Sequence, residues 1–380
     1  MSSQRPDIDP TDLKLFIPGP THVRKKLLEA QAAPMIGHRS EFMKELLADI
    51  LPGIRECFGT KGDVVALSCS STAAMEAVSR SVTRPDDRLL HLVNGNFSNL
   101  WAKLSDACGY DVGIEEKEWG DAWDEQSVSL ALDEHGPVGA VFVAHCETST
   151  AALSDIAGVV RAVRAKCPDA LVCVDVTSSA CGAKIDFDAL DIDIAVGGVQ
   201  KAWALPPALA LAALSPRAKA RMAEVPGRGY TNDLLSALKY QDDKGMTSTT
   251  PAIPVMQALR VQLQDIAASG GMQARFDRHL EMQKLVADWV ARYGFSILAK
   301  EGARSPTVTS IGCEGRFAMA ELVKGYREAG YFITGGYGKT KETHWRIGHM
   351  GDHTPACVTE VLRVTDEILD RIGLQAPASA

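Results

Sequence analysis

Apolar residues in the first half of the chain gather in short runs bounded by Gly, Pro, Ser or charged residues. The runs span 64–67, 89–93, 140–144, 170–174 and 194–196 and are rich in valine, leucine and alanine. Runs of this length are typical of strands buried on both faces. An amphipathic segment between two of them carries Ile156, Val159, Val160 and Val163 at helical spacing. This alternation predicts an α/β fold with a mainly parallel sheet covered by helices.

The pattern changes near residue 255, where apolar residues recur at helical spacing from Met256 to Trp289. Two further helical patterns lie near 319–326 and 358–369, and a strand-like segment at 345–351 separates them. We therefore expect an N-terminal arm over residues 1–22, a large domain over 23–265 and a small C-terminal domain over 266–380. Earlier in the chain, Ser40 precedes an amphipathic stretch and is expected to cap a helix.

Composition and charge narrow the classes of function. The 380 residues are 46% hydrophobic and 23% charged, and the net charge is -8. An acidic chain in which no cluster of lysines and arginines exceeds the short run at 24–26 is a poor partner for nucleic acid. No apolar run is long enough to span a bilayer, and the polar start does not resemble a signal peptide, so we expect a cytoplasmic protein that does not bind membranes. Nine cysteines without a C-x-x-C pair predict neither disulfides nor a metal site.

Lys201 occupies an unusual position, directly after an apolar run and the glycine pair at 197–198, and ahead of the prolines at 206–207. The prolines prevent a helix from starting at once, so the lysine is expected at a strand end. A lysine that is partly desolvated there has a lowered pKa and can act as an amine nucleophile. A first exposed loop residue is the plainer interpretation of Lys201 taken alone.

A second group of polar residues, Ser70, Ser71 and Thr72, follows the run at 64–67 and precedes an alanine-rich helical segment. Free backbone N–H groups at a helix start, together with hydroxyl groups, form an anion-binding cradle. A simple helix cap is the alternative.

Several polar or aromatic residues share one expected location, the carboxyl ends of the strands. They are Ser71, Phe97, Ser149, Asp175 and Lys201. Ligands of open α/β sheets collect at this edge. A lysine, an aspartate and an anion cradle are the groups needed to hold pyridoxal phosphate, through its aldehyde, its ring nitrogen and its phosphate.

These residues belong to an ordered series of motifs that resembles the class V, fold-type I pyridoxal-phosphate aminotransferases, in the group of alanine–glyoxylate, serine–pyruvate and serine–glyoxylate transaminases. The motifs are P-G-P at 18–20, G-H at 37–38, S-S-T-A-A-M-E at 70–76, G-N-F at 95–97, H-C-E-T-S-T at 145–150, V-D at 174–175, V-Q-K-A at 199–202, T-P at 250–251 and R-I-G at 346–348. The resemblance implies a mainly parallel seven-stranded sheet flanked by helices, a smaller α+β C-terminal domain, and a homodimer whose subunits share the active site.

The resemblance also implies a role for individual residues. Lys201 would be the Schiff-base lysine and the proton carrier, Asp175 would pair with the ring nitrogen, and Phe97 would stack on the ring. Arg346 would bind the substrate carboxylate, with the backbone of Gly19 nearby. The remaining expected cofactor contacts are Ser70, Ser71, Thr72, Thr148, Ser149, Thr177 and Gln200, with Thr249 or Thr250 reaching the phosphate of the partner subunit.

The chain departs from the usual pattern of this family at a few positions. Ser71, Ala151 and Ala208 replace glycines, and Val199 replaces a serine. The changes at Ser71 and Val199 alter the hydroxyl groups near the expected phosphate, but none affects the lysine, the aspartate or the arginine.

The expected activity is a ping-pong transamination from a small amino acid of the alanine, serine or aspartate type to a small 2-oxo acid of the glyoxylate or pyruvate type. Phosphoserine or another acidic amino acid is an alternative donor. A lyase of the cysteine desulfurase type is a second alternative, although only Cys313 and Cys357 lie in the C-terminal part where such an enzyme carries its catalytic cysteine. A protein that keeps the fold as a non-catalytic binding module is the third.

Overall fold

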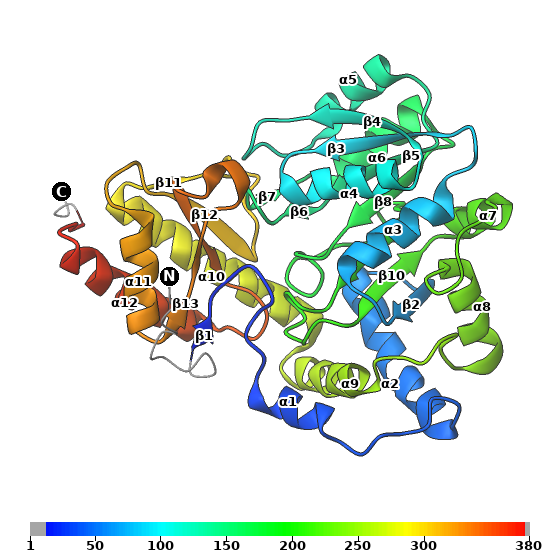
Figure 1. Ribbon diagram of the computed structural model, residues 1–380, viewed down its shortest axis with the longest axis horizontal. Coiled ribbons are helices and arrows are strands. Elements are labelled where there is room, and N and C mark those ends of the chain that lie inside the picture. Colours follow the sequence, from blue (N-terminus) through cyan, green and yellow to red (C-terminus); the bar gives the residue numbers. More distant parts are fainter. Residues whose placement is uncertain (1–12, 377–380) are drawn as a thin grey trace, which may run out of the picture.

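The computed structural model describes residues 13–376, and seven strands form its central sheet (Figure 1). Their order across the sheet is β2-β10-β9-β8-β5-β3-β4. Strand β10 runs antiparallel to both of its neighbours, and the other neighbouring pairs are parallel. The expected mainly parallel sheet is therefore confirmed. The strands are β2 (Asp63–Leu67), β3 (Arg88–Val93), β4 (Asp111–Glu116), β5 (Ala140–Ala144), β8 (Leu171–Asp175), β9 (Ile194–Gly198) and β10 (Ala210–Leu214).

Helices cover both faces of this sheet because successive strand residues point to opposite sides. Val65 and Leu67 of β2 face one helical layer, and Val64 and Ala66 face the other. The first layer contains α3 (Ser71–Val82), α4 (Asn96–Ala107), α7 (Pro216–Glu224) and α8 (Leu234–Lys244). The second contains α1 (Lys25–Gln31), α2 (Glu41–Phe58), α5 (Glu125–His135), α6 (Ile156–Lys166) and α9 (Ile253–Ala268).

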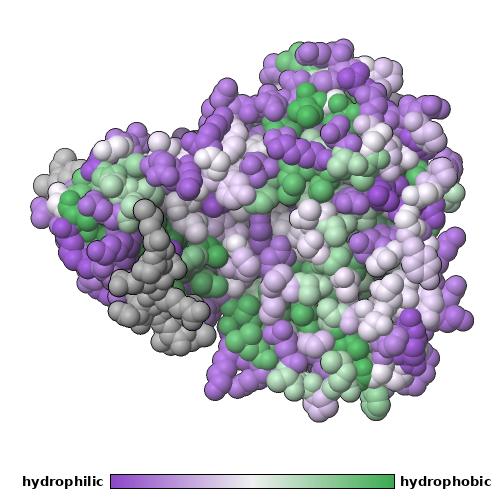
Figure 2. Space-filling view, in the orientation of Figure 1, coloured by the Kyte–Doolittle hydropathy of each residue, from purple (hydrophilic) through white to green (hydrophobic). Residues whose placement is uncertain are grey.

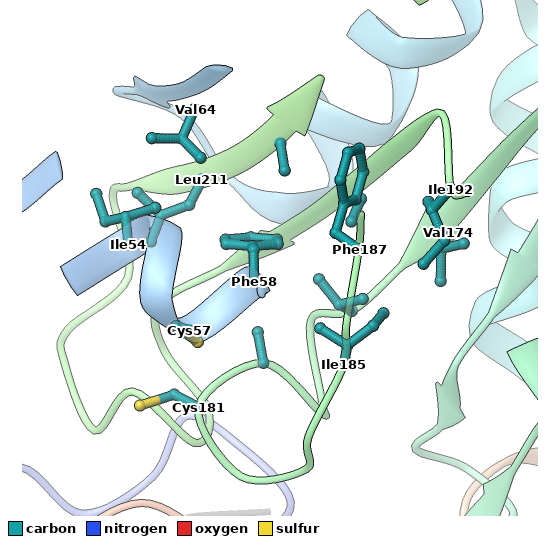
Figure 3. Close-up of a cluster of buried hydrophobic side chains, with 14 of the residues drawn as sticks. Ile54, Cys57, Phe58, Val64, Val174, Cys181, Ile185, Phe187, Ile192 and Leu211 are labelled. Carbon is teal, nitrogen blue, oxygen red and sulfur yellow. The ribbon is translucent and has the colours of Figure 1, made fainter. Parts of the chain in front are cut away.

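The second layer shows how the apolar runs are buried. Ile54 and Phe58 of α2 point toward Val64 of β2 and Leu211 of β10, and Phe187 lies beside them (Figure 3). All five side chains are almost completely buried. Because each strand is covered on both sides, its run of apolar residues is continuous rather than alternating.

The C-terminal part of the chain forms a smaller sheet with its own helices, which lies beside the large sheet (Figure 1). Its four-stranded sheet has the order β11-β12-β15-β14, and β1 pairs with β13 beside it. Its core is packed against three helices. The elements are β1 (Lys14–Leu15), α10 (Gly271–Tyr293), β11 (Ser296–Ile297), β12 (Val308–Gly312), α11 (Met319–Glu328), β13 (Tyr331–Phe332), β14 (Thr334–Gly335), the 3-10 turn η2 (Gly338–Thr340), β15 (His344–Gly348) and α12 (Pro355–Arg371).

Helix α10 connects the two parts. Met272 and Phe276 near its start pack into the core of the large sheet, whereas Met282 and the residues beyond it pack into the C-terminal core. We therefore propose the division expected from the sequence, with a large domain over 23–265 and a small domain over 266–380, α10 being the connecting helix. Of the proposed arm over 1–22, residues 1–12 lie outside the described part of the chain.

A polar network holds the two domains in register. Asp352, just after β15, accepts hydrogen bonds from Arg24 ahead of α1, from Arg275 of α10 at 2.9 Å and from Gln262 of α9 at 2.9 Å. These contacts keep the end of β15 against the large domain. Buried charge-assisted hydrogen bonds of this kind constrain geometry strongly.

One strand was not expected from the sequence, and two local expectations differ from the structure. The edge strand β4 contains no apolar run, because several of its side chains are charged and exposed. Ser40 precedes α2, but its hydroxyl donates to Gly37 O at 2.6 Å and makes no capping bond. The long helical pattern after Met256 is divided into α9 and α10 at Gly270, whose φ is +99°. Glycine adopts this left-handed conformation without steric cost.

None of the helices between residues 13 and 376 combines the length and the apolar character needed to cross a bilayer.

Candidate active site

Lys201 lies just beyond β9, with only 8% of its surface exposed. Its Nζ donates to Thr148 Oγ1 at 2.6 Å and to Ser178 Oγ at 2.7 Å. Burial lowers the pKa of Lys201, and the nearby Asp175 carboxylate partly opposes this change. A lower pKa gives a larger fraction of neutral amine, which is the form that attacks a carbonyl.

The loop ahead of α1 covers the stem of this lysine. Gly19 has a φ of +114°, and a Cβ atom at this position would lie 2.8 Å from Cγ of Lys201. Thr21 N donates to Gln200 O at 2.9 Å and attaches the same loop to the lysine segment. Gly19 thus allows the backbone to approach Lys201 more closely than a larger residue could.

Asp175 is the last residue of β8 and is buried. The one hydrogen bond that its carboxylate makes within residues 13–376 comes from Thr177 N, at 2.8 Å to Oδ1. Burial raises the pKa of Asp175, while Thr177 and Lys201 act in the opposite direction. A buried carboxylate with an oxygen still open on a cavity is suited to a protonated ring nitrogen.

The start of α3 faces the same region. Ser70 caps the helix by accepting from Ala73 N at 3.1 Å, while Ser71 Oγ accepts from Gln200 Nε2 at 2.9 Å. A Cβ atom at Gly198 would collide with both Ser71 Oγ and Gln200, so only glycine permits this packing. The N–H groups at this helix start, the hydroxyls of Ser71 and Thr72 and the Gln200 amide together form a cradle for an anion.

Phe97 lies in the first turn of α4, with its ring centroid 5.0 Å from Nζ of Lys201. Its backbone N–H donates to the carboxylate of Glu147, which is fully buried. The same carboxylate accepts from Ser98 N at 2.8 Å and Oγ at 2.9 Å, and from Ser149 N at 2.9 Å and Oγ at 2.7 Å. Glu147 therefore holds the start of α4, and with it Phe97, in place.

Glu147 was not predicted as a site residue. It lies in β6 (Cys146–Glu147), the first strand of a short hairpin completed by β7 (Ala152–Leu153). The available signal was an acidic residue close behind the buried strand β5, because a carboxylate is costly to bury unless it is hydrogen-bonded or paired.

Arg346 reaches the cavity from β15 of the small domain. Its Nη1 donates to Thr148 O at 3.3 Å, and its Nε has no partner within the described chain. Burial lowers the pKa of Arg346 to about 10, so the guanidinium stays protonated at neutral pH. A protonated guanidinium with a free edge is suited to a carboxylate.

A cavity of about 340 Å³ brings most of the predicted site residues together. Its lining includes Gly19, Ser71, Thr72, Phe97, Thr148, Asp175, Thr177, Gln200, Lys201 and Arg346. It also includes residues that were not predicted, namely Ile17, Pro18, Pro20, Met75, Leu100, Thr334 and Tyr337.

Four predicted site residues do not line this cavity. Ser70 serves as the cap of α3, and Ser149 donates its hydroxyl to Glu147. Thr249 and Thr250 lie in the turn before α9, where Thr250 is exposed and Thr249 O accepts from Thr247 Oγ1 at 2.8 Å.

The lining fits pyridoxal phosphate. The Thr177 hydroxyl and Nε of Arg346 are buried without a partner in the described part of the chain, and Asp175 makes a single hydrogen bond there. Buried polar groups normally find partners, so these groups indicate a polar ligand. Lys201 would hold the aldehyde carbon, Asp175 the ring nitrogen and the start of α3 the phosphate.

Known proteins share this architecture. Residues 23–337 match the family Aminotransferase class-V. An uncharacterised aminotransferase of Methanocaldococcus jannaschii is 33% identical over 98% of this chain and 96% of its own. The L-aspartate–glyoxylate aminotransferase of Paracoccus denitrificans is 29% identical over 98% of this chain and 93% of its own. The crystal structure of an aspartate aminotransferase from Thermus thermophilus is 30% identical, with a TM-score of 0.87 over 94% of this chain and 99% of its own. The chain therefore belongs to the class-V aminotransferase family and is a pyridoxal-phosphate-dependent aminotransferase.

Proposed function

We propose that the enzyme moves the amino group of a small amino acid, of the alanine, serine or aspartate type, to a small 2-oxo acid of the glyoxylate or pyruvate type. The observation that carries this proposal is that Lys201, Asp175 and Arg346 converge on one cavity from both domains. The amine, the carboxylate and the guanidinium are respectively suited to a carbonyl, a ring nitrogen and a substrate carboxylate.

Pyridoxal phosphate, when bound, supplies a ring that accepts the electron pair left at the substrate's α carbon. Lys201 Nζ would move the proton to and from that carbon, and the Thr148 and Ser178 hydroxyls orient the amine for this step. Arg346 would fix the substrate carboxylate and so align the bond to be broken. The same residues serve both halves of a ping-pong reaction, since donor and acceptor carry their carboxylates at the same place.

The remaining contacts are proposed from position. Ser71, Thr72 and Gln200 would bind the phosphate, with Ser70 holding the helix start. Thr148 lines the cavity and would bond the ring hydroxyl, whereas Ser149 would act through Glu147. The Thr177 hydroxyl and the backbone of Gly19 would contact the cofactor and the substrate respectively.

The proposal also includes assembly, namely that the enzyme is a homodimer in the cytoplasm. Figure 2 shows hydrophobic residues over the lower part of the large domain, where α1, α2 and α9 lie in Figure 1. Met35, between α1 and α2, is 70% exposed, and Phe42, in the first turn of α2, is 64% exposed. Exposed apolar side chains of this size favour burial against another chain. Thr249 or Thr250 would then reach the phosphate of the partner subunit.

A lyase of the cysteine desulfurase type needs a cysteine whose thiol reaches the sulfur atom of the substrate. Cys313 directly follows β12 in the sequence and is buried, and Cys357 is exposed at the start of α12. Within residues 13–376, no cysteine lines the cavity. The transaminase is therefore the better supported of the two reactions.

A single-turnover absorbance titration of the holoenzyme tests the proposal. Alanine, serine, aspartate, glutamate and phosphoserine are added in turn, and glyoxylate or pyruvate is added afterwards. A transaminase loses the absorbance of the lysine-bound cofactor with its donor and recovers it with its acceptor, and Lys201→Ala abolishes both changes. Consumption of the amino acid without a need for a 2-oxo acid would instead establish a lyase.

A further inference from the structure

Tyr337 occupies a distinctive place in the cavity, on the loop between β14 and β15. Its ring centroid is 5.5 Å from that of Phe97, and the guanidinium of Arg346 lies 5.5 Å from the Tyr337 ring. The side chain lines the cavity and is also 41% exposed. Tyr337 thus stands between the proposed carboxylate-binding group and the solvent.

Backbone and side-chain hydrogen bonds between Tyr337 and Thr340 hold this loop in place around η2. Thr340 N donates to Tyr337 O at 3.0 Å, and Tyr337 N donates to Thr340 Oγ1 at 3.1 Å. A Cβ atom at Gly338 would lie 3.1 Å from the indole ring of Trp119, and Nζ of Lys339 lies 4.9 Å from the centroid of that ring. Because Trp119 belongs to the large domain, the loop bridges the two domains.

We propose that Tyr337 limits the length of the amino donor's side chain. A substrate whose carboxylate binds Arg346 and whose α carbon lies beside Lys201 must direct its side chain into the space that remains. The Tyr337 ring, which lies 5.5 Å from the Arg346 guanidinium and 5.5 Å from the Phe97 ring centroid, lines that space from the small domain. This inference rests on the proposed function, from which it takes the position of the substrate.

The position of the ring makes this wall restrictive. The cavity that Tyr337 lines has to hold the pyridine ring and the phosphate arm as well as the substrate. Because the Tyr337 backbone is hydrogen-bonded to Thr340, the loop cannot shift to admit a longer side chain at low cost. One methylene group that a pocket cannot accommodate is worth roughly 10–200-fold in kcat/KM.

The test compares the holoenzymes of the wild type, Tyr337→Ala and Tyr337→Phe. Donors are alanine, 2-aminobutyrate, norvaline and norleucine, with glyoxylate as acceptor. We expect the norvaline-to-alanine ratio of kcat/KM to rise at least about tenfold in Tyr337→Ala and to stay within about twofold in Tyr337→Phe. A role of Tyr337 in stability alone would lower kcat/KM for all four donors by the same factor, leave the ratio unchanged and overturn the proposal.

Binding without turnover provides an independent measurement. Propanoate and pentanoate are titrated calorimetrically into the same holoenzymes, since each carboxylate can occupy Arg346. We expect the preference for pentanoate over propanoate to rise about tenfold in Tyr337→Ala, and an unchanged preference would refute the steric role. If no amino acid reacts with the wild type, the proposed function fails, while the carboxylate series still decides the role of Tyr337.

Discussion

Substitution of Glu147 by glutamine tests how this protein holds the Phe97 ring beside Lys201. The carboxylate accepts hydrogen bonds from five groups, the backbone N–H of Phe97, Ser98 and Ser149 and the hydroxyls of both serines. No lysine or arginine in the described part of the chain bonds to it. Its negative charge is therefore stabilised by N–H and O–H groups and by the start of α4.

The magnitude follows from counting the donors on each oxygen. Oε2 accepts from Ser98 N at 2.8 Å, and Oε1 accepts from Ser149 N at 2.9 Å. Glutamine has the same shape, but its NH₂ group must take one of the two places, which leaves one of these N–H groups without a partner. A buried N–H without a partner costs about 1–3 kcal/mol, and the lost attraction between charge and helix dipole adds up to about 2 kcal/mol. We expect Glu147→Gln to lower the free energy of unfolding by about 1–5 kcal/mol.

Urea unfolding followed by circular dichroism measures this change, with Glu125→Gln as the control. Glu125 is also in a first helical turn, but its carboxylate is exposed and pairs with Arg161, so the control should change by less than about 1 kcal/mol. Because Phe97 is attached to the same carboxylate, the affinity of Glu147→Gln for pyridoxal phosphate should also fall, by about tenfold. A Glu147→Gln protein within about 0.5 kcal/mol of the wild type would refute the reasoning, because it would mean that the N–H groups around residue 147 do not need two acceptor oxygens.

Three further predictions concern other residues. Asp175→Asn should lower kcat by about 10²–10³-fold without changing the circular dichroism spectrum, and an unchanged kcat would exclude a role at the ring nitrogen. Arg346→Lys should raise the KM of donor and acceptor about tenfold or more, because an ammonium cannot form two parallel hydrogen bonds to a carboxylate. Steady-state kinetics measure this change, and an unchanged KM would contradict a role of Arg346 in binding the carboxylate. Burial lowers the pKa of His91 to about 3, so below pH 6.5 the unfolded chain binds a proton that the folded chain does not. The free energy of unfolding should therefore decrease as the pH is lowered from 6.5 toward 3, and His91 should account for up to about 2 kcal/mol of this decrease at pH 5. Urea unfolding at pH 7.5 and at pH 5 measures the decrease, which should be smaller in His91→Phe than in the wild type.

The sequence predicts the groups whose signal is local. Lys201 and Asp175 stand at the ends of apolar runs, where a charge is unexpected, and the parallel sheet places both at one edge. Ser149 shows the limit of this reasoning. It follows the same strand as Glu147, and only the β6–β7 hairpin determines that its hydroxyl donates to that carboxylate rather than lining the cavity.

Tyr337 shows a second limit, since its place depends on contacts between segments distant in sequence. The loop that carries it lies against Trp119 of the large domain, and its ring lies against Phe97. No pattern within the loop itself indicates either contact. For this reason the sequence predicts Lys201 and Asp175 as site residues, but it does not place Tyr337 in the cavity.

The hydrogen-bonding character of the cavity explains why these groups need a ligand. Nζ of Lys201, Nε of Arg346, the Thr177 hydroxyl and the start of α3 can all donate hydrogen bonds, whereas Asp175 is the carboxylate in the lining. Buried donors without acceptors oppose folding. A phosphate and a substrate carboxylate would supply acceptors to the α3 start and to Arg346, and a protonated ring nitrogen would supply Asp175 with a donor. Binding of the cofactor and the substrate would therefore supply partners to groups that have none in the protein alone, and the free energy of binding would stabilise the folded protein by mass action.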